Sequence, residues 1–138
     1  MKKIGFSLLT VLVISLYSCD PQGTTDSNTT QVVTSGNWRV SLFTDSGNDE
    51  TSTYSGYTFL FNENGTLAAS RNGSTRNGTW SINSSSNKFM IDLGVKNDPA
   101  NSLGELTDDW KILSKSATEI RLGDDNTTSN EFLTFSKN

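Results

Sequence analysis

Apolar and polar side chains alternate along the chain from residue 36 to residue 138. A period of two residues is typical of β-strands that bury one face and leave the other in water. No segment has a sustained helical period, and residues 97–105 leave room for one helical turn at most. Eight runs follow the two-residue pattern: Trp38–Phe43, Thr58–Asn62, Leu67–Ala69, Trp80–Ile82, Phe89–Leu93, Trp110–Leu113, Ile120–Leu122 and Phe132–Phe135.

The connections between these runs favour a meander. Asn-Gly pairs stand at residues 64–65, 72–73 and 77–78, and these residue types tolerate the positive φ that tight hairpin turns need. Eight antiparallel strands in a row either leave two unpaired edges or close on themselves, and closure removes the edges. The sequence therefore predicts an all-β fold over residues 36–138, a small eight-stranded antiparallel up-and-down β-barrel.

The N-terminus has a different pattern. Lys2 and Lys3 precede a mainly apolar segment at residues 4–16, which is shorter than the roughly 20 residues of a membrane-spanning helix and is typical of an export signal. The residues Leu16-Tyr17-Ser18-Cys19 resemble the lipobox of bacterial lipoproteins. The resemblance implies a signal peptide at residues 1–18, cleavage before Cys19 and lipidation of Cys19. The alternative is a secretory signal with a cysteine nearby by chance.

A lipidated cysteine would also fix the location. Several acyl chains hold a protein lastingly at a membrane, so we expect an exported protein anchored in the cell envelope, most often in the outer membrane of a Gram-negative bacterium. Its periplasmic or surface exposure stays open. Residues 19–35 are polar and rich in Thr, with Pro21 and Gly23 as breakers. They predict a flexible tether between the anchor and the barrel.

The amino-acid composition excludes several kinds of active site and metal site. The chain has a net charge of −4, one Cys and no His. It therefore lacks a Ser-His or Cys-His nucleophile pair and a thiolate zinc site. An acidic chain does not suit nucleic acid, whose binding depends on neutralising phosphates. The acidic loops lack the spacing of a calcium loop, and no pair of carboxylates is placed for catalysis. We expect no metal, no cofactor and no enzymatic activity.

Several motifs resemble the compact lipocalin-like domains of bacterial lipoproteins. The chain has Gly36-Asn37-Trp38, then the run from Phe59 to Gly65, then Gly78-Thr79-Trp80 and Trp110-Lys111-Ile112, in that order. The resemblance implies that Trp38 plugs one end of the barrel. It also implies that Arg121 packs across Trp38, as a late arginine does in lipocalins. A fold of this kind does not by itself define a ligand.

The inward-facing positions are dominated by Trp, Phe, Leu and Ile, which predicts a filled barrel rather than a deep cavity. A long fatty acid or haem should not fit inside. If a small molecule binds, it should lie at the mouth framed by the long connections 45–54, 94–105 and 123–130. There Tyr54, Tyr57 and Trp110 would meet a small apolar or glycan-like group.

Some apolar residues fall on the outward phase. Phe43, Leu60 and Phe132 would lie on neighbouring strands, and together they would form a patch for a protein partner. The alternative is that the last strand has the opposite phase. Two functions therefore remain: a lipid-anchored binding module, or a structural or inhibitory lipoprotein that docks on an envelope protein. A continuous cavity would favour the first, and a filled barrel with an apolar outer patch the second.

Overall fold

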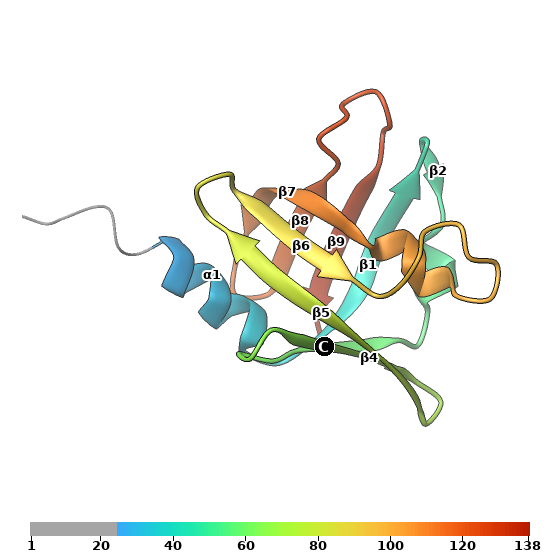
Figure 1. Ribbon diagram of the computed structural model, residues 1–138, viewed down its shortest axis with the longest axis horizontal. Coiled ribbons are helices and arrows are strands. Elements are labelled where there is room, and N and C mark those ends of the chain that lie inside the picture. Colours follow the sequence, from blue (N-terminus) through green and yellow to red (C-terminus); the bar gives the residue numbers. More distant parts are fainter. Residues whose placement is uncertain (1–24) are drawn as a thin grey trace, which may run out of the picture.

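The computed structural model describes residues 25–138, and Cys19 and the rest of the N-terminal segment lie outside the described residues. Eight strands of the described chain form a closed antiparallel barrel in which sequence neighbours pair and β1 closes on β9 (Figure 1). The barrel strands are β1 (Asn37–Asp45), β3 (Thr58–Phe61), β4 (Thr66–Arg71), β5 (Ser74–Asn83), β6 (Lys88–Asp92), β7 (Asp108–Lys115), β8 (Glu119–Gly123) and β9 (Phe132–Lys137). A two-residue strand, β2 (Asn48–Asp49), pairs with the end of β1. The predicted fold class is confirmed.

Each of the eight predicted runs is a strand, but the turn prediction is only partly right. The pairs at residues 64–65 and 72–73 lie in hairpin turns, and Asn72 and Gly73 have φ of 52° and 79°. The pair Asn77-Gly78 lies inside β5 instead, where Gly78 pairs with Leu67. A Cβ at Gly78 would lie 2.1 Å from the carbonyl oxygen of Asp92 on β6. Close packing of the two strands, rather than a turn, explains this glycine.

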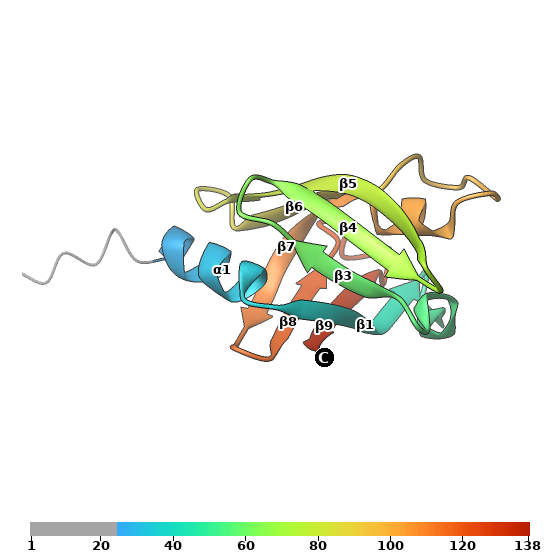
Figure 2. The ribbon, with the colours of Figure 1, turned by 90° about the horizontal axis from the view of Figure 1, so that it is seen from below.

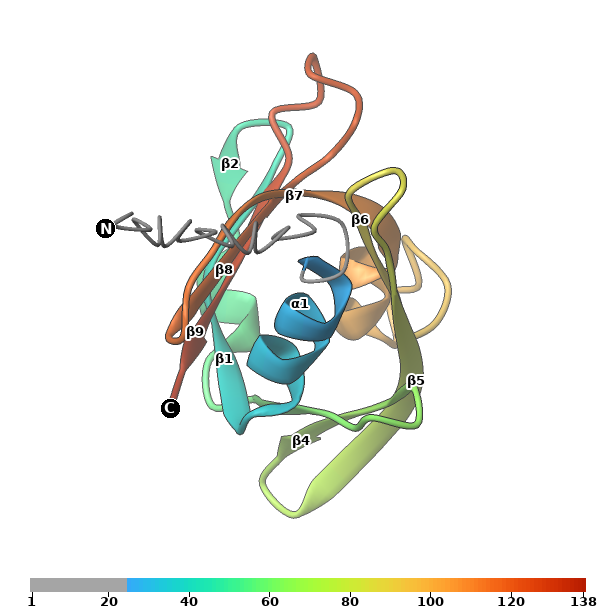
Figure 3. The same cartoon turned by 90° about the vertical axis from the view of Figure 1, so that its left-hand side faces the viewer.

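The flexible tether predicted for residues 19–35 is wrong for its second half. Helix α1 (Thr25–Thr34) covers one end of the barrel, as Figure 3 shows in a view toward that end. Val33 is fully buried, and its carbonyl oxygen accepts a hydrogen bond from Nε1 of Trp38 at 2.8 Å. Val32 also packs against the core. The other residues of α1 are polar, so the helix has no apolar period that could be recognised in the sequence. Within residues 25–138 no helix is long and apolar enough to span a bilayer.

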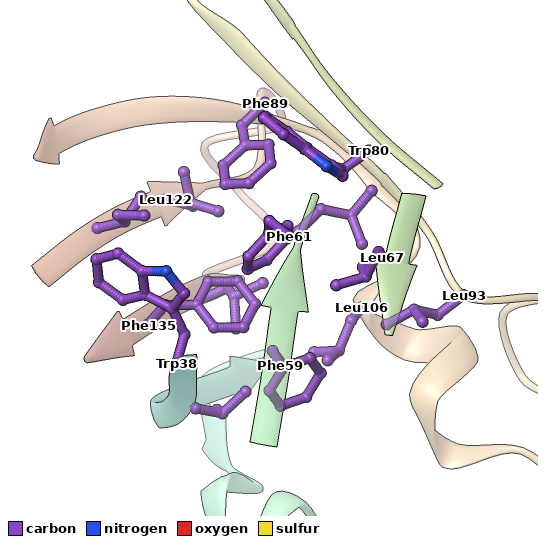
Figure 4. Close-up of a cluster of buried hydrophobic side chains, with 14 of the residues drawn as sticks. Trp38, Phe59, Phe61, Leu67, Trp80, Phe89, Leu93, Leu106, Leu122 and Phe135 are labelled. Carbon is purple, nitrogen blue, oxygen red and sulfur yellow. The ribbon is translucent and has the colours of Figure 1, made fainter. Parts of the chain in front are cut away.

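Aromatic side chains occupy the middle of the barrel (Figure 4). Phe61 lies at the centre, with its ring centroid 5.7 Å from Trp80, 5.4 Å from Phe89 and 5.5 Å from Phe135. Phe59 extends the cluster, 5.3 Å from Phe135. These rings contact one another from β3, β5, β6 and β9, so protein side chains fill the interior as the sequence predicts.

The end of the barrel opposite α1 carries the long connections, and we call it the rim (Figures 1 and 2). Two short 3-10 helices, η1 (Thr51–Tyr54) and η2 (Ser102–Leu106), lie there. Tyr54 of η1 and Leu106 of η2 are buried, and the hydroxyl of Tyr54 donates to the carbonyl oxygen of Ser102 at 3.2 Å. The one helical turn allowed for residues 97–105 corresponds to η2. Both ends of the barrel are thus covered by short helices.

Candidate functional site

A surface groove opens where β1 and β3 separate. The two strands pair only at Asn37 with Leu60 and at Trp38 with Phe59. Beyond these pairs η1 lies beside β1, where the hydroxyl of Thr51 accepts a hydrogen bond from the backbone N–H of Phe43. The groove has a volume of about 370 Å³, and we call it the rim groove. It is lined by Arg39, Val40, Thr51, Ser52, Tyr54, Ser55, Gly56, Tyr57, Thr58 and Asn138. Hydroxyl groups make up much of this lining, so the rim groove can donate and accept hydrogen bonds.

A second hollow of about 330 Å³ lies on the other side of Tyr57, and we call it the rim cup. It is lined by Tyr57, Ala69, Arg71, Asn72, Ser74, Thr75 and Arg76. Arg71 follows the buried residues Leu67 and Ala69 at the two-residue spacing of β4, so it lies on the inward face beyond the core. Arg76 pairs with Ala69 across the β4–β5 hairpin. The rim cup is thus the inner face of this hairpin where it extends past the filled interior.

Both arginines of the rim cup are held in place by neutral groups. The guanidinium carbon of Arg71 lies 4.0 Å from the ring centroid of Tyr57, and its Nη1 donates to the carbonyl oxygen of Thr53 at 3.2 Å. Nε of Arg76 donates to the carbonyl oxygen of Leu93 at 3.3 Å. Within the described chain, neither arginine has a carboxylate oxygen within 4 Å. Since a guanidinium has five N–H donors, most of theirs remain available.

Of the three residues predicted at the mouth of the barrel, Tyr54 and Tyr57 line the hollows and Trp110 does not. Tyr57 is half-buried and lines both hollows, and Tyr54 lines the rim groove although it is almost fully buried. Trp110 is wrong as a mouth residue, because it is completely buried and its Nε1 donates to the carbonyl oxygen of Leu106 at 3.0 Å. Sequence reasoning missed Arg71 and Arg76. The signal was their inward phase on the two strands that flank the turn at residues 72–73.

An ion triad covers Trp110. Nζ of Lys96 lies 5.9 Å from the ring centroid of Trp110, bonds to the carboxylate of Asp108 and lies 3.5 Å from Oε1 of Glu131. Burial is the largest single influence on Asp108 and would raise its pKa, but the hydrogen bonds from Lys96 and from Asp109, together with the charge of Lys96, lower the net pKa. Burial raises the pKa of Glu131, with the charge of Lys96 opposing it. The triad ties the 94–107 connection to the 124–131 connection.

The predicted barrel plug is half right. Trp38 is completely buried, as the lipocalin resemblance implies. Arg121 does not pack across it: Arg121 is exposed, because it alternates with the buried residues Ile120 and Leu122 on β8. The cation over the Trp38 ring is Lys137, whose Nζ is 5.5 Å from the ring centroid. Lys137 pairs directly with Trp38 across the seam between β1 and β9.

The predicted partner patch of Phe43, Leu60 and Phe132 does not form. A bulge between Val40 and Leu42 shifts the phase of β1 and turns Phe43 into the core, where its ring lies 5.2 Å from that of Tyr54. Leu60 and Phe132 are 38% and 42% exposed. They lie toward opposite ends of β1, however, since Leu60 pairs with Asn37 and Phe132 pairs with Thr44.

The acidic groups of the rim do not gather into a metal site. Across residues 25–138, no three or more His, Cys, Asp or Glu side chains come together in a group that could hold a metal ion. The described hollows at the rim instead offer aromatic rings, hydroxyl groups and guanidinium groups. This set suits hydrogen bonding and stacking with a polar ligand.

Comparison with solved structures supports the barrel fold. The fold is similar to the crystal structure of a DUF4847 family protein from Bacteroides vulgatus, with a TM-score of 0.56 and 17% identity over 80% of this chain and 97% of that one. It is also similar to an uncharacterized protein from Bacteroides eggerthii, with a TM-score of 0.50 and 15% identity over 75% of this chain and 98% of that one. At this identity the likeness shows the fold alone. No protein-family model matches the chain, and a search of the curated proteins finds no significant match.

Proposed function

We propose that this protein is a lipid-anchored lipoprotein of the cell envelope that binds a small glycan-like ligand at the rim of a filled barrel. The observation that carries the ligand proposal is the pair of hollows that share Tyr57, one between β1, β3 and η1 and the other on the inner face of the β4–β5 hairpin. A polar saccharide suits the site better than an apolar molecule. The aromatic cluster occupies the interior, whereas the two hollows are lined by hydroxyl, amide and guanidinium groups.

In this proposal the barrel is a rigid scaffold without catalytic activity, and Tyr57 is its central contact. An aromatic ring can stack against the apolar face of a sugar, while hydroxyl groups around it bond to the sugar hydroxyls. Thr51, Ser52 and Ser55 supply such hydroxyls on the rim-groove side of Tyr57, and Ser74 and Thr75 supply them on the rim-cup side.

The anchor would set the orientation of the rim. If Cys19 is acylated, only residues 20–24 separate it from the start of α1 at Thr25. An extended chain of that length reaches about 20 Å. The end covered by α1 would then lie next to the membrane, and the rim would point away from it toward its ligand.

The anchor and the ligand are tested separately. Metabolic labelling with a radioactive fatty acid, together with the mass of the mature N-terminus, tests the anchor: we expect label on the wild type and none on Cys19→Ala. For the ligand, residues 20–138 contain the whole closed barrel and can be screened on a glycan array. Tyr57→Ala should abolish any binding found, whereas Phe132→Ala, a matched loss of an exposed aromatic ring, should not. An unlabelled mature protein contradicts the anchor, and binding that survives Tyr57→Ala contradicts the site.

A protein-partner role is the second candidate, and one observation favours it. Leu113 and Phe132 are 49% and 42% exposed. Both lie close to Gly123, where a Cβ would meet Leu113 Cδ1 at 3.2 Å and Phe132 Cδ1 at 3.4 Å. Crosslinking from residue 113 to an envelope protein in intact cells, lost in Phe132→Ser, would support this role.

A further inference from the structure

Arg71 and Arg76 have no acidic partner within residues 25–138, although the chain is acidic overall. The chain has a net charge of −4, and carboxylates within residues 25–138 form ion pairs with Lys88 and Lys96. Arg71 and Arg76 lack such a pair and both line the rim cup. We propose that the rim cup binds an anionic group, a carboxylate or sulfate, carried by the saccharide. This inference rests on the proposed function and names the chemical class of its ligand.

Contacts of Arg71 with its neighbours hold its guanidinium group in place before an anion binds. The group lies 4.0 Å from the ring centroid of Tyr57, and its side chain runs past Gly56, where an added Cβ would lie 3.7 Å from Arg71 Cδ. Its bond to the carbonyl oxygen of Thr53 fixes one Nη atom. A planar guanidinium that is already ordered loses less entropy when it binds a carboxylate or sulfate through two N–H groups. A guanidinium stacked on an aromatic ring keeps its positive charge, and no described carboxylate neutralises it.

Arg76 lines the rim cup from β5, the strand paired with the β4 strand that carries Arg71. Its Nε bonds to the carbonyl oxygen of Leu93. The backbone of Gly94 allows a close approach, since a Cβ there would lie 2.9 Å from Nη2 of Arg76. Asp92 lines the neighbouring hollow together with Arg76, but its Oδ1 accepts from the backbone N–H of Gly94 at 3.0 Å and makes no ion pair with Arg76. Two cations therefore line one hollow together with the buried residue Ala69.

The size of the rim cup fits this ligand class. Its volume of about 330 Å³ is enough for a sugar ring with a charged substituent. Tyr57 lines both the rim cup and the rim groove. A neutral sugar linked to the charged one would therefore lie in the rim groove, against its hydroxyl groups. The charged group would therefore set the register of the saccharide along the rim.

The test compares a charged sugar with its neutral form. Residues 20–138, labelled with ¹⁵N, are titrated with methyl glucuronoside and separately with the methyl ester of its carboxylate. We expect the acid to shift the Nε–H signals of Arg71 and Arg76, with a dissociation constant at least about tenfold lower than that of the ester. The double variant Arg71→Gln/Arg76→Gln should lose the preference for the acid. Arg121→Gln, which removes an exposed arginine outside the rim cup, should keep it.

Each result decides between the proposals. Equal binding of acid and ester, or a preference for the acid that survives the double variant, overturns the anionic class and leaves saccharide binding standing. No shift with either sugar at about 50 mM contradicts both the anionic class and the proposed function. If the double variant does not fold, as its amide spectrum would show, Arg76→Gln alone replaces it, since Arg76 makes one hydrogen bond to a backbone carbonyl.

Discussion

The ammonium group of Lys137 lies 5.5 Å from the ring centroid of Trp38, directly across the seam where β9 closes on β1. Nε1 of the same ring donates to the carbonyl oxygen of Val33 in α1. Trp38 therefore joins the first and last strands of the barrel to the helix that covers its end. The arginine that the lipocalin resemblance assigned to this place, Arg121, is exposed on β8.

Trp38 should be a principal source of stability. Trp38→Ala removes a fully buried ring and is expected to lower the free energy of unfolding by about 3–5 kcal/mol. Lys137→Met should cost about 0.5–1 kcal/mol through the lost cation–π contact, and Arg121→Met should have no measurable effect. Urea unfolding of the three variants provides the measurement. A larger loss for Arg121→Met than for Lys137→Met would contradict the structural assignment.

We expect the buried phenol of Tyr54 to make the free energy of unfolding decline above a pH of about 10. Burial raises the pKa of its phenol well above the usual value, and the nearby carboxylates of Glu105 and Glu50 add to the shift. The raised pKa stabilises the fold fully below a pH of about 10, where tyrosine in the unfolded chain begins to ionise. Above that pH the unfolded state gains a charge that the folded state resists, so stability declines.

Tyr54→Phe isolates this effect. At neutral pH the variant should lose about 1 kcal/mol, because the carbonyl oxygen of Ser102 loses its partner. Above pH 10 its stability should decline less steeply than that of the wild type. Urea unfolding at several pH values measures both, and parallel pH curves for the two proteins would show that Tyr54 ionises normally.

Lys96 should stabilise the rim mainly at neutral pH. The depressed pKa of Asp108 contributes stability above the ordinary aspartate pKa of about 4, and that stability is lost as the pH falls through the lower folded pKa. Lys96→Met would leave Asp108 and Glu131 half-buried without their cation, at a cost of about 1–3 kcal/mol at pH 7.

The difference between wild type and Lys96→Met should shrink as the pH approaches about 4, because protonation then removes the unpaired charges. Lys111→Met is the matched control, since Lys111 is an exposed lysine on β7. Thermal unfolding between pH 4 and 7 measures the effect. A difference that stays constant over this range would mean that Lys96 acts by packing on Trp110 alone.

Gly78 should tolerate no side chain. In Gly78→Ala the new Cβ would lie 2.1 Å from the carbonyl oxygen of Asp92 and 2.9 Å from Cδ2 of Leu93. Relief of this overlap must push β5 and β6 apart, at an expected cost of about 1–3 kcal/mol. Asn77→Ala changes the exposed neighbouring residue of the same strand and should cost much less. Equal stability of the two variants, measured in urea, would argue for a turn at this position.

The alternation of apolar and polar residues predicted the strands correctly, but it did not predict the position of every side chain. The alternation around Phe59 and Phe61, and around Phe89 and Ile91, gave both the strand and the buried face correctly. The same reasoning failed at Phe43, because a single bulged residue reverses the phase of everything after it. It failed at Asn77-Gly78, because a glycine needed for close strand packing looks the same in sequence as one in a turn.

By itself the sequence determined the barrel, its strand order and its aromatic filling, since these follow from a two-residue period and from the size of the inward side chains. Only the tertiary structure decided that α1 covers one end, that Lys137 rather than Arg121 meets Trp38, and that Arg71 and Arg76 share the rim cup with Tyr57. The reason is physical. Alternation depends on neighbours within one strand, whereas these contacts depend on the register between strands and on where each strand extends past the core.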